Sequence, residues 1–386
     1  MGIVIDGALA APDTDAAREG VARRYRPELD AVRFLAFLLV FLFHALPVPL
    51  IGRPGWRVNL SLMEACALGL CLFFTLSAYL ITDILLTERE NNTVISVKKF
   101  YIRRILRIWP LYFFGIALGI VIAIAINRPG DINGFVWYLL FAGNLYCIAF
   151  GWLGNPFAPL WTISIEEQFY FLWPWAIRRF SRRGLVACSL LFILAANLTL
   201  WILGQRHADM GREVWANTLV QFEMFAAGIL LALAKKRLAW QNSGVGLILV
   251  LTGPVLWFFA CYRYYLKQSG ALGMAMSGTD LIVRYVLIAL GCAAILQGFC
   301  MIGPSHIPQW AAYLGKISYG LYVYHLLSIE FAHALFSSMH GLAFVITSAL
   351  VALLLTIAIA VISYALLESP FLRIKRRFEI IHTRSI

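Results

Sequence analysis

The sequence predicts an all-α fold, a polytopic bundle of about ten transmembrane helices in a membrane. Of the 386 residues, 61% are hydrophobic and only 13% are charged, whereas a typical soluble domain has about 25% charged residues. Apolar runs of about 20 residues, long enough to cross a bilayer as a helix, recur from one end of the chain to the other. Regularly spaced strands of alternating polarity are not evident, which argues against a membrane β-barrel.

Hydropathy places nine expected spans and one ambiguous region, 135–177, along the chain. That region holds either two crossings or one crossing and a partly inserted segment. With one crossing, Lys and Arg gather on the cytoplasmic side, and with two they divide almost evenly, so the positive-inside bias favours ten crossings with both termini cytoplasmic. Whether 135–160 is re-entrant stays open. The nine spans are 33–51, 60–86, 108–126, 185–203, 218–234, 244–265, 281–302, 314–336 and 342–367.

Three segments follow from this topology: a short cytoplasmic tail at 1–26, a membrane domain at 27–373 and a basic cytoplasmic tail at 374–386. Membrane orientation accounts for the net charge of +12, so we expect no nucleic-acid partner. The seven cysteines lie mostly inside apolar runs and form no CxxC pair, so we expect no metal site and no disulfide. Oligomeric state is not readable, and a homo-oligomer stays open.

Ionisable side chains inside spans are the first functional candidates, because each costs about 2.5–3.5 kcal/mol on insertion scales. Arg33 and His44 are eleven residues apart, so they share one helix face about 16 Å apart along the axis. The alternative is a snorkelling anchor and an interfacial histidine. The ionisable residues within spans are Arg33, His44, Glu64, Glu166, Glu167, Glu223, Arg284, His325, Glu330 and His333.

A basic cluster precedes the third span, in KKFYIRRILRIWPLYF at 98–113. Arg104 and Arg107 are three residues apart and are therefore neighbours on a helix, with Arg103 beside them. The planar guanidinium group of arginine suits phosphate binding. The alternative is that these charges only set membrane orientation.

Two further stretches place polar side chains at helical spacing. In LWTISIEEQFYFLWPW, residues 160–175, Glu166 and Tyr170 can share a helix face. The alternative there is a Glu–Arg pair that only holds two helices together. In LGKISYGLYVYHLL, residues 314–327, a polar stripe contains Ser318, Tyr322 and His325, which interhelical hydrogen bonding explains equally well.

These stretches together resemble the acyltransferase-3 family of membrane O-acyltransferases over about 27–373. The family's first span carries a basic residue followed, after ten other residues, by a histidine, and Arg33 and His44 match this pattern. Arg104 and Arg107 match the family's RxxR motif. FFTLSAYLIT at 73–82 is similar to the family's FFxLSGFLIT, with Ala78 and Tyr79 as departures. WTISIEEQFYFLWP, ISYGLYVYHLL and LLESPF also match. The basic tail ending at 386 suggests a compact member without a fused hydrolase-like domain.

The resemblance implies transfer of an acyl group, most often acetyl, from cytoplasmic acyl-CoA to a hydroxyl of a carbohydrate or glycosylated acceptor. Acyl-CoA would be a donor substrate and not a permanently bound cofactor, and the membrane would be the bacterial inner membrane. A covalent acyl-histidine relay stays open, as do the acceptor and the acyl chain. The roles expected are general base for His44, its orientation for Glu166, CoA binding for Arg33, Arg103, Arg104 and Arg107, and the acceptor path for Tyr170, Ser318, Tyr322 and His325.

A transporter or flippase for a lipid-linked saccharide is the main alternative function, because it would also need buried charges and a polar cavity. It predicts no CoA dependence and gives no reason for an arginine cluster that binds CoA. The enzymatic interpretation requires one spatial arrangement of these residues. The imidazole of His44 and the guanidinium cluster should lie along a single water-accessible passage through the bundle.

Overall fold

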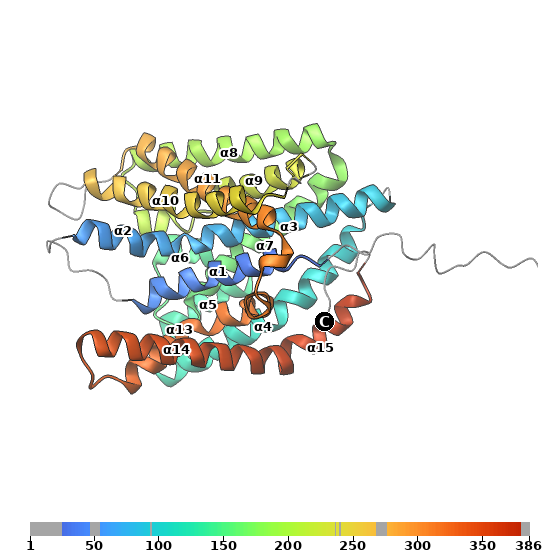
Figure 1. Ribbon diagram of the computed structural model, residues 1–386. Helices are drawn as coiled ribbons and strands as arrows, with labels where there is room; N and C mark the ends of the chain where they lie inside the picture. Colours follow the sequence, from blue (N-terminus) through green and yellow to red (C-terminus); the bar gives the residue numbers. More distant parts are fainter. Residues whose placement is uncertain are drawn as a thin grey trace, which may run out of the picture.

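The computed structural model describes residues 25–46, 55–92, 95–235, 237–238, 241–267 and 276–379, and these ranges contain helices and no strands (Figure 1). Nearly all of the expected tail 1–26 and most of the expected tail 374–386 lie outside the described residues. The α-helices are α1 (Pro27–Ala45), α2 (Trp56–Ala67), α3 (Gly69–Asn92), α4 (Val97–Ala125), α5 (Pro129–Leu139), α6 (Gly143–Phe150), α7 (Trp161–Arg179), α8 (Arg182–Gln205), α9 (Thr218–Ala234), α10 (Ser243–Lys267), α11 (Gly278–Ile302), α12 (Gln309–Lys316), α13 (Ser318–Leu335), α14 (Gly341–Ser363) and α15 (Ser369–Arg376). Short 3₁₀ turns are η1 (Ala158–Leu160) and η3 (Pro304–His306), and π-helical turns are η2 (Met210–Val214) and η4 (Tyr364–Glu368).

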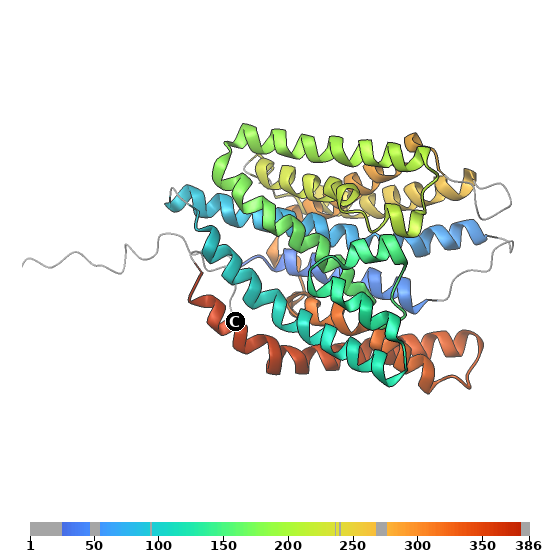
Figure 2. The same ribbon diagram turned by 180° about the vertical axis from the view of Figure 1, so that it is seen from behind.

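The long helices run side by side, with α8 at one edge of the bundle and α14 at the other (Figures 1 and 2). Between them α8 packs on α9, α9 on α3, α10 on α11 and α13 on α14, while α1 contacts α3, α12 and α13. The two edge helices bury only 22% of their most apolar stretches. Their remaining apolar surface is suited to lipid, so the bundle presents hydrocarbon-compatible faces and keeps its polar groups inside.

Six helices of the described chain are long and apolar enough to cross a membrane. The expected number of about ten is therefore not established by length and composition. The difference lies mainly in α1, α7, α9 and α13, which have only 17 to 19 residues. Of these, α1 and α7 carry ionisable side chains that lower their mean hydropathy. The six spans are Trp56–Asn91, Val97–Ala125, Arg182–Gln205, Ser243–Leu266, Gly278–Ile302 and Gly341–Arg376.

The first helix lies earlier in the chain than the hydropathy pattern placed it. Instead of 33–51, α1 occupies Pro27–Ala45. Pro27 stands in its first turn, where a missing N–H costs nothing. At the other end Leu46 is extended, with φ −89° and ψ 144°, because it precedes Pro47. The shift leaves both Arg33 and His44 inside one helix.

The ambiguous region contains one full-length helix, α7, preceded by two short ones. The 11 residues of α5 and the 8 of α6 rise about 16 Å and 12 Å, well short of the 30 Å hydrocarbon core. Neither is long enough to cross alone, and partial insertion of this segment stays a prediction. Side chains of α7 satisfy part of this irregular backbone, because the Gly143 N–H donates to the Ser164 hydroxyl at 3.1 Å and the Gln168 amide donates to the Phe141 carbonyl at 3.0 Å.

Small residues decide how closely α10 and α11 approach. A methyl group at Gly298 would lie 2.6 Å from the Gly246 carbonyl oxygen, and one at Gly291 would lie 2.9 Å from the Gly253 carbonyl oxygen. The glycines of each helix therefore face the backbone of the other. Such contacts drive helix association in membranes, where lipid removes most of the hydrophobic advantage.

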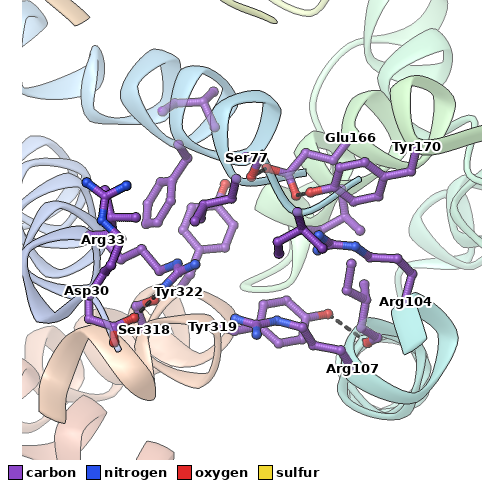
Figure 3. A pocket seen from close by; sticks show the side chains of 18 of the residues that line it. Asp30, Arg33, Ser77, Arg104, Arg107, Glu166, Tyr170, Ser318, Tyr319 and Tyr322 are labelled. Carbon is purple, nitrogen blue, oxygen red and sulfur yellow. Dashed lines mark hydrogen bonds and ion pairs between the residues drawn. The ribbon is translucent and has the colours of Figure 1, made fainter. Parts of the chain in front are cut away.

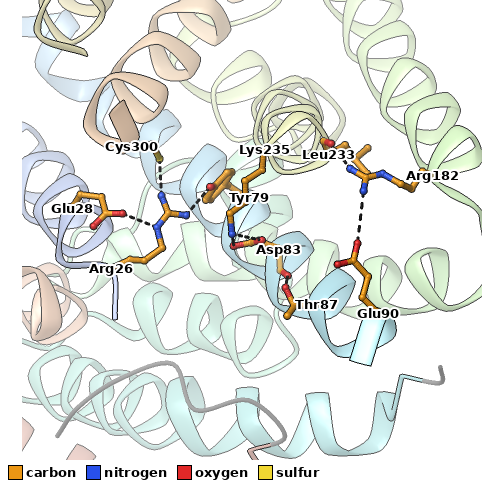
Figure 4. A network of polar contacts seen from close by, with 10 residues as sticks. All are labelled: Arg26, Glu28, Tyr79, Asp83, Thr87, Glu90, Arg182, Leu233, Lys235 and Cys300. Atoms are coloured by element: carbon orange, nitrogen blue, oxygen red, sulfur yellow. Dashed lines mark hydrogen bonds and ion pairs between the residues drawn. The ribbon is translucent and has the colours of Figure 1, made fainter. Parts of the chain in front are cut away.

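Polar contacts join several helices at one end of the bundle (Figure 4). Arg26 donates to Glu28 at 2.6 Å, to the Tyr79 hydroxyl at 2.8 Å and to Cys300 Sγ at 3.1 Å, which links α1 to α3 and α11. Lys235 pairs with Asp83 at 2.9 Å and joins α9 to α3. These contacts therefore hold the start of α1 against α3 and α11, and the end of α9 against α3.

Candidate active site

A cavity of about 170 Å³ lies among α1, α3, α4, α7 and α13 (Figure 3). We call it the arginine cavity, because several arginine side chains reach it from different elements. Its polar lining residues are Tyr25, Arg26, Asp30, Arg33, Ser77, Arg104, Arg107, Glu166, Tyr170, Ser318, Tyr319 and Tyr322. Seven of the ten residues chosen from the sequence are in this group: Arg33, Arg104, Arg107, Glu166, Tyr170, Ser318 and Tyr322.

Arg104 is held in this cavity by aromatic rings. Its guanidinium carbon lies 4.9 Å from the ring centre of Tyr170 and 5.5 Å from that of Phe100. No acidic side chain of the described residues forms a salt bridge with it. A cation held over aromatic faces keeps its charge available to an anionic ligand. Arg107 lines the same cavity from the same helix, as the three-residue spacing predicts.

Arg33 reaches the cavity from the opposite wall, on α1 (Figure 3). Its guanidinium pairs with the buried Asp30 carboxylate one turn earlier. The second oxygen of that carboxylate accepts a hydrogen bond from the Tyr25 hydroxyl at 3.0 Å. Asp30 therefore fixes the direction of Arg33, and the sequence analysis gave neither Asp30 nor Tyr25 a role.

Glu166 takes a different partner from the one expected. Its two oxygens accept hydrogen bonds from the Ser77 hydroxyl at 2.9 Å and the Tyr170 hydroxyl at 2.8 Å. The expected pairing with His44 is not formed, because His44 lines another cavity. The four-residue spacing of Glu166 and Tyr170 does predict their contact correctly. Ser77 was missed because it comes from α3, 89 positions away in the chain.

Arg103 does not join Arg104 and Arg107 in the arginine cavity, contrary to the prediction from the sequence. It pairs with Glu88 of α3 at 2.5 Å and donates to the Phe378 carbonyl at 3.1 Å. It is not among the lining residues of the arginine cavity. Helical spacing alone would allow Arg103 to neighbour Arg107, four residues later, but its guanidinium is held by Glu88 instead. Arg103 has a structural role, because these contacts connect α4 to α3 and to the residues that follow α15.

His44 lines a second and larger cavity of about 620 Å³. Its Nδ1 lies 2.9 Å from the Val40 carbonyl oxygen. Since a carbonyl only accepts, we assign the proton to Nδ1, which leaves Nε2 as the basic nitrogen. We call this space the histidine cavity. Its lining residues include His44, Met63, Glu64, Leu70, Trp152, Trp161, Trp215, Tyr264 and Arg284.

The two cavities meet at a wall and do not form the single passage that was expected. Within the part of the chain that the structure describes, Leu70 is the one residue that lines both. Tyr322 lines the arginine cavity, and His325, three residues later on α13, is buried with its ring centre 5.1 Å from that of His44. His325 therefore packs against the His44 ring and is not among the lining residues of either cavity. Helix α1 nevertheless passes both spaces, with Arg33 in one and His44 in the other.

The other residues expected along the acceptor path lie with the arginines. Tyr170, Ser318 and Tyr322 all line the arginine cavity. The Tyr322 hydroxyl lies 3.0 Å from the Thr162 hydroxyl and donates to the Pro159 carbonyl at 3.2 Å. These contacts fix the ring of Tyr322 at the boundary between α13 and α7.

Comparisons with known proteins place this arrangement in a family. A family model described as an acyltransferase domain matches residues 26–368. The peptidoglycan O-acetyltransferase OatA of Listeria monocytogenes is 34% identical over 164 residues, 40% of this chain and 24% of that protein. YrhL of Bacillus subtilis, provisionally named a peptidoglycan O-acetyltransferase, is 27% identical over 78% of this chain and 48% of its own length.

A Staphylococcus aureus protein, provisionally named an O-acetyltransferase, is 25% identical over 90% of this chain and 57% of that protein. The chain thus spans between about a quarter and just over half of the length of these relatives. No solved structure matches. The family match covers every candidate residue, and this chain belongs to the acyltransferase-3 family of membrane acyltransferases.

Proposed function

We propose that this protein is a membrane-bound O-acyltransferase that moves an acetyl group from acetyl-CoA to a hydroxyl of a glycan. The observation that carries the proposal is the course of α1 within a family-matched domain. The helix presents Arg33 to a cavity that also holds Arg104 and Arg107, and it presents His44 to the neighbouring cavity. The names of the relatives, peptidoglycan O-acetyltransferases, support acetyl as the acyl group and a glycan as the acceptor.

The arginine cavity is the proposed donor site. Its volume of about 170 Å³ is below the 300–1,000 Å³ of sites that enclose a whole small molecule. It therefore takes only the narrow pantetheine arm, while the phosphates of CoA stay near its mouth. Arg104, Arg107 and Arg33 would bind those phosphates. Glu166 then acts through Ser77 and Tyr170, whose hydroxyls it holds in the cavity wall.

His44 is the proposed general base. Its Nε2 removes the proton of the acceptor hydroxyl, and the hydroxyl oxygen attacks the thioester carbonyl. The tetrahedral intermediate collapses, the C–S bond breaks, and the proton on His44 passes to the departing thiolate of CoA. The products are the acetyl ester and free CoA thiol. Leu70, which lines both cavities, would have to turn aside for the thioester to meet His44.

The proposed setting is the bacterial inner membrane, with the arginine cavity on the cytoplasmic side and both termini cytoplasmic. The positive-inside bias supports this orientation, because the basic stretch that opens α4 lies beside the arginine cavity. The donor then approaches from the cytoplasm, where acetyl-CoA is made.

The test separates donor binding from transfer in purified protein reconstituted in lipid nanodiscs. Radiolabelled acetyl-CoA and soluble peptidoglycan fragments are supplied to the wild type, His44→Ala and Arg104→Ala. We expect the histidine variant to bind CoA and transfer nothing, and the arginine variant to bind CoA at least tenfold more weakly. Full transfer by His44→Ala would reject the base. In sealed liposomes that contain the protein, saccharide movement across the membrane without any CoA requirement would favour the transporter.

A covalent relay is examined in the same preparation. Wild-type protein is mixed with radiolabelled acetyl-CoA in the absence of acceptor and denatured after short intervals. Direct proton abstraction by His44 predicts no labelled protein. Label that requires His44 and disappears when acceptor is added would instead show an acyl-imidazole intermediate.

A further inference from the structure

The histidine cavity contains a buried ion pair that the proposed donor site and base do not use. Arg284 of α11 donates to Glu64 of α2 at 2.8 Å, and the Tyr265 hydroxyl donates to the other Glu64 oxygen. The guanidinium carbon of Arg284 also lies 5.1 Å from the ring centre of Tyr264. Both charged residues line the cavity. The pair therefore has a defined orientation and faces an enclosed space.

Helix association alone does not explain where this pair points. Ionised groups within a membrane bundle are costly and usually face an interior pathway. The Glu64 side chain is 26% exposed and the Arg284 side chain 11% exposed. A carboxylate with two oxygens offers about four acceptor positions, so the two donors on Glu64 leave capacity for further hydrogen bonds. Because Glu64 lines the histidine cavity, a ligand in that cavity would meet this carboxylate.

Aromatic rings share the wall of the cavity with aliphatic side chains such as Leu60, Leu68 and Ile288. Trp152 and Trp161 lie 5.4 Å apart between ring centres, and Trp215 and Tyr264 line the same space. At about 620 Å³ the cavity has the volume of a site that encloses a small ligand. Flat rings suit the C–H faces of a pyranose, while carboxylate and guanidinium groups suit the hydroxyls at its edge. A hydrocarbon chain would use the rings and leave the ion pair unused.

We propose that the histidine cavity is a saccharide-binding site for the acceptor. The Glu64 carboxylate accepts hydrogen bonds from two neighbouring hydroxyls of one sugar unit, Arg284 donates to the same unit, and the tryptophan rings pack on its face. A further hydroxyl of the glycan then lies beside His44. This inference rests on the proposed function and adds to it the site and the chemistry by which the acceptor is selected.

The experiment uses full-length protein in nanodiscs with two probes, N-acetylglucosamine tetrasaccharide and soluble peptidoglycan fragments. Binding is followed through tryptophan fluorescence without CoA, and transfer through radiolabelled acetyl-CoA. The variants are Glu64→Gln, which keeps the shape of the side chain, and Met63→Trp, which fills the cavity without touching the ion pair. Leu62→Trp is the matched control, because Leu62 is the preceding residue of α2 and is 52% exposed on the outer surface.

We expect at least one probe to change wild-type fluorescence saturably. Glu64→Gln should raise the KM for that glycan at least tenfold while kcat changes less than threefold. Met63→Trp should abolish glycan binding with CoA affinity within twofold of wild type, and Leu62→Trp should match wild type. Melting temperatures within 2–3 °C of wild type show that the variants are folded.

Three results would overturn the saccharide site. They are no fluorescence change with either probe, an unchanged KM in Glu64→Gln, and normal glycan binding in Met63→Trp. Displacement of the glycan signal by added phospholipid would assign the cavity to an acyl chain. The proposed function fails separately, if wild type shows no CoA-dependent transfer. Transfer with unaltered KM values in the variants would leave the enzyme standing and reject only this site.

Discussion

The imidazole rings of His44 and His325 lie 5.1 Å apart between centroids and cross at 63°. His325 is buried, and its Nδ1 lies 2.6 Å from the Tyr322 carbonyl oxygen. Its ring is thereby fixed by its own helix, α13, and forms the surface against which His44 of α1 rests. The direction of the proposed base depends on two helices that are far apart in sequence.

Replacing His325 with alanine should reduce acyl transfer through kcat. The His44 ring would lose its supporting contact and visit other rotamers. We expect kcat to fall about 10- to 100-fold, equivalent to ~1.4–2.7 kcal/mol in the activation barrier. His333→Ala is the control, because His333 lies on the same helix, contacts Phe344 at 5.3 Å and lines neither cavity. Equal kcat values for His325→Ala and His333→Ala would contradict the supporting role.

Arg104 and Arg103 should separate donor binding from stability, although they are neighbours in sequence. Arg104→Ala is expected to raise the KM for acetyl-CoA at least tenfold with little change in melting temperature. Arg103→Ala leaves the buried Glu88 carboxylate without its 2.5 Å partner, which costs about 3–5 kcal/mol. It should lower the melting temperature and leave the donor KM within threefold. Transfer rates at varied acetyl-CoA concentration and thermal unfolding in detergent measure the two effects, and the reverse pattern would refute the assignment.

Leu70 should act as a barrier between the two cavities. Leu70→Ala removes most of the one side chain that both share, so water from the histidine cavity should reach the thioester. We expect hydrolysis of acetyl-CoA without acceptor to rise at least threefold. Leu72→Ala is the control, since Leu72 is fully buried on the same helix and lines neither space. Similar hydrolysis in both variants would indicate loosened packing instead of an opened wall.

The close approach of α10 and α11 should be sensitive to a single side chain. Gly298→Leu would place its Cβ 2.6 Å from the Gly246 carbonyl oxygen, and such overpacking costs about 1–3 kcal/mol. Gly130→Ala, with no atom within 4 Å of the added methyl group, should leave stability unchanged. Thermal unfolding in detergent compares them. An unaltered melting temperature for Gly298→Leu would mean that the helices can separate without loss.

Local geometry could be predicted from the sequence wherever one helix contains all the partners. The order and approximate limits of the long helices follow from apolar runs, although Pro47 was needed to see that the first ends at Ala45. The shared helix of Arg33 and His44, the common face of Arg104 and Arg107, and the contact of Tyr170 with Glu166 all follow from 3.6 residues per turn.

Only the tertiary structure decided which helices supply the second partner of each polar group. Glu166 binds Ser77 of α3, 89 positions away, and Arg284 pairs with Glu64 across 220 positions. It also decided that the arginines and His44 line two spaces with Leu70 between them. Hydrogen-bonded helical periodicity fixes neighbours three and four residues apart, whereas the meeting of distant helices depends on how whole side-chain surfaces interlock. No repeat along the chain encodes that.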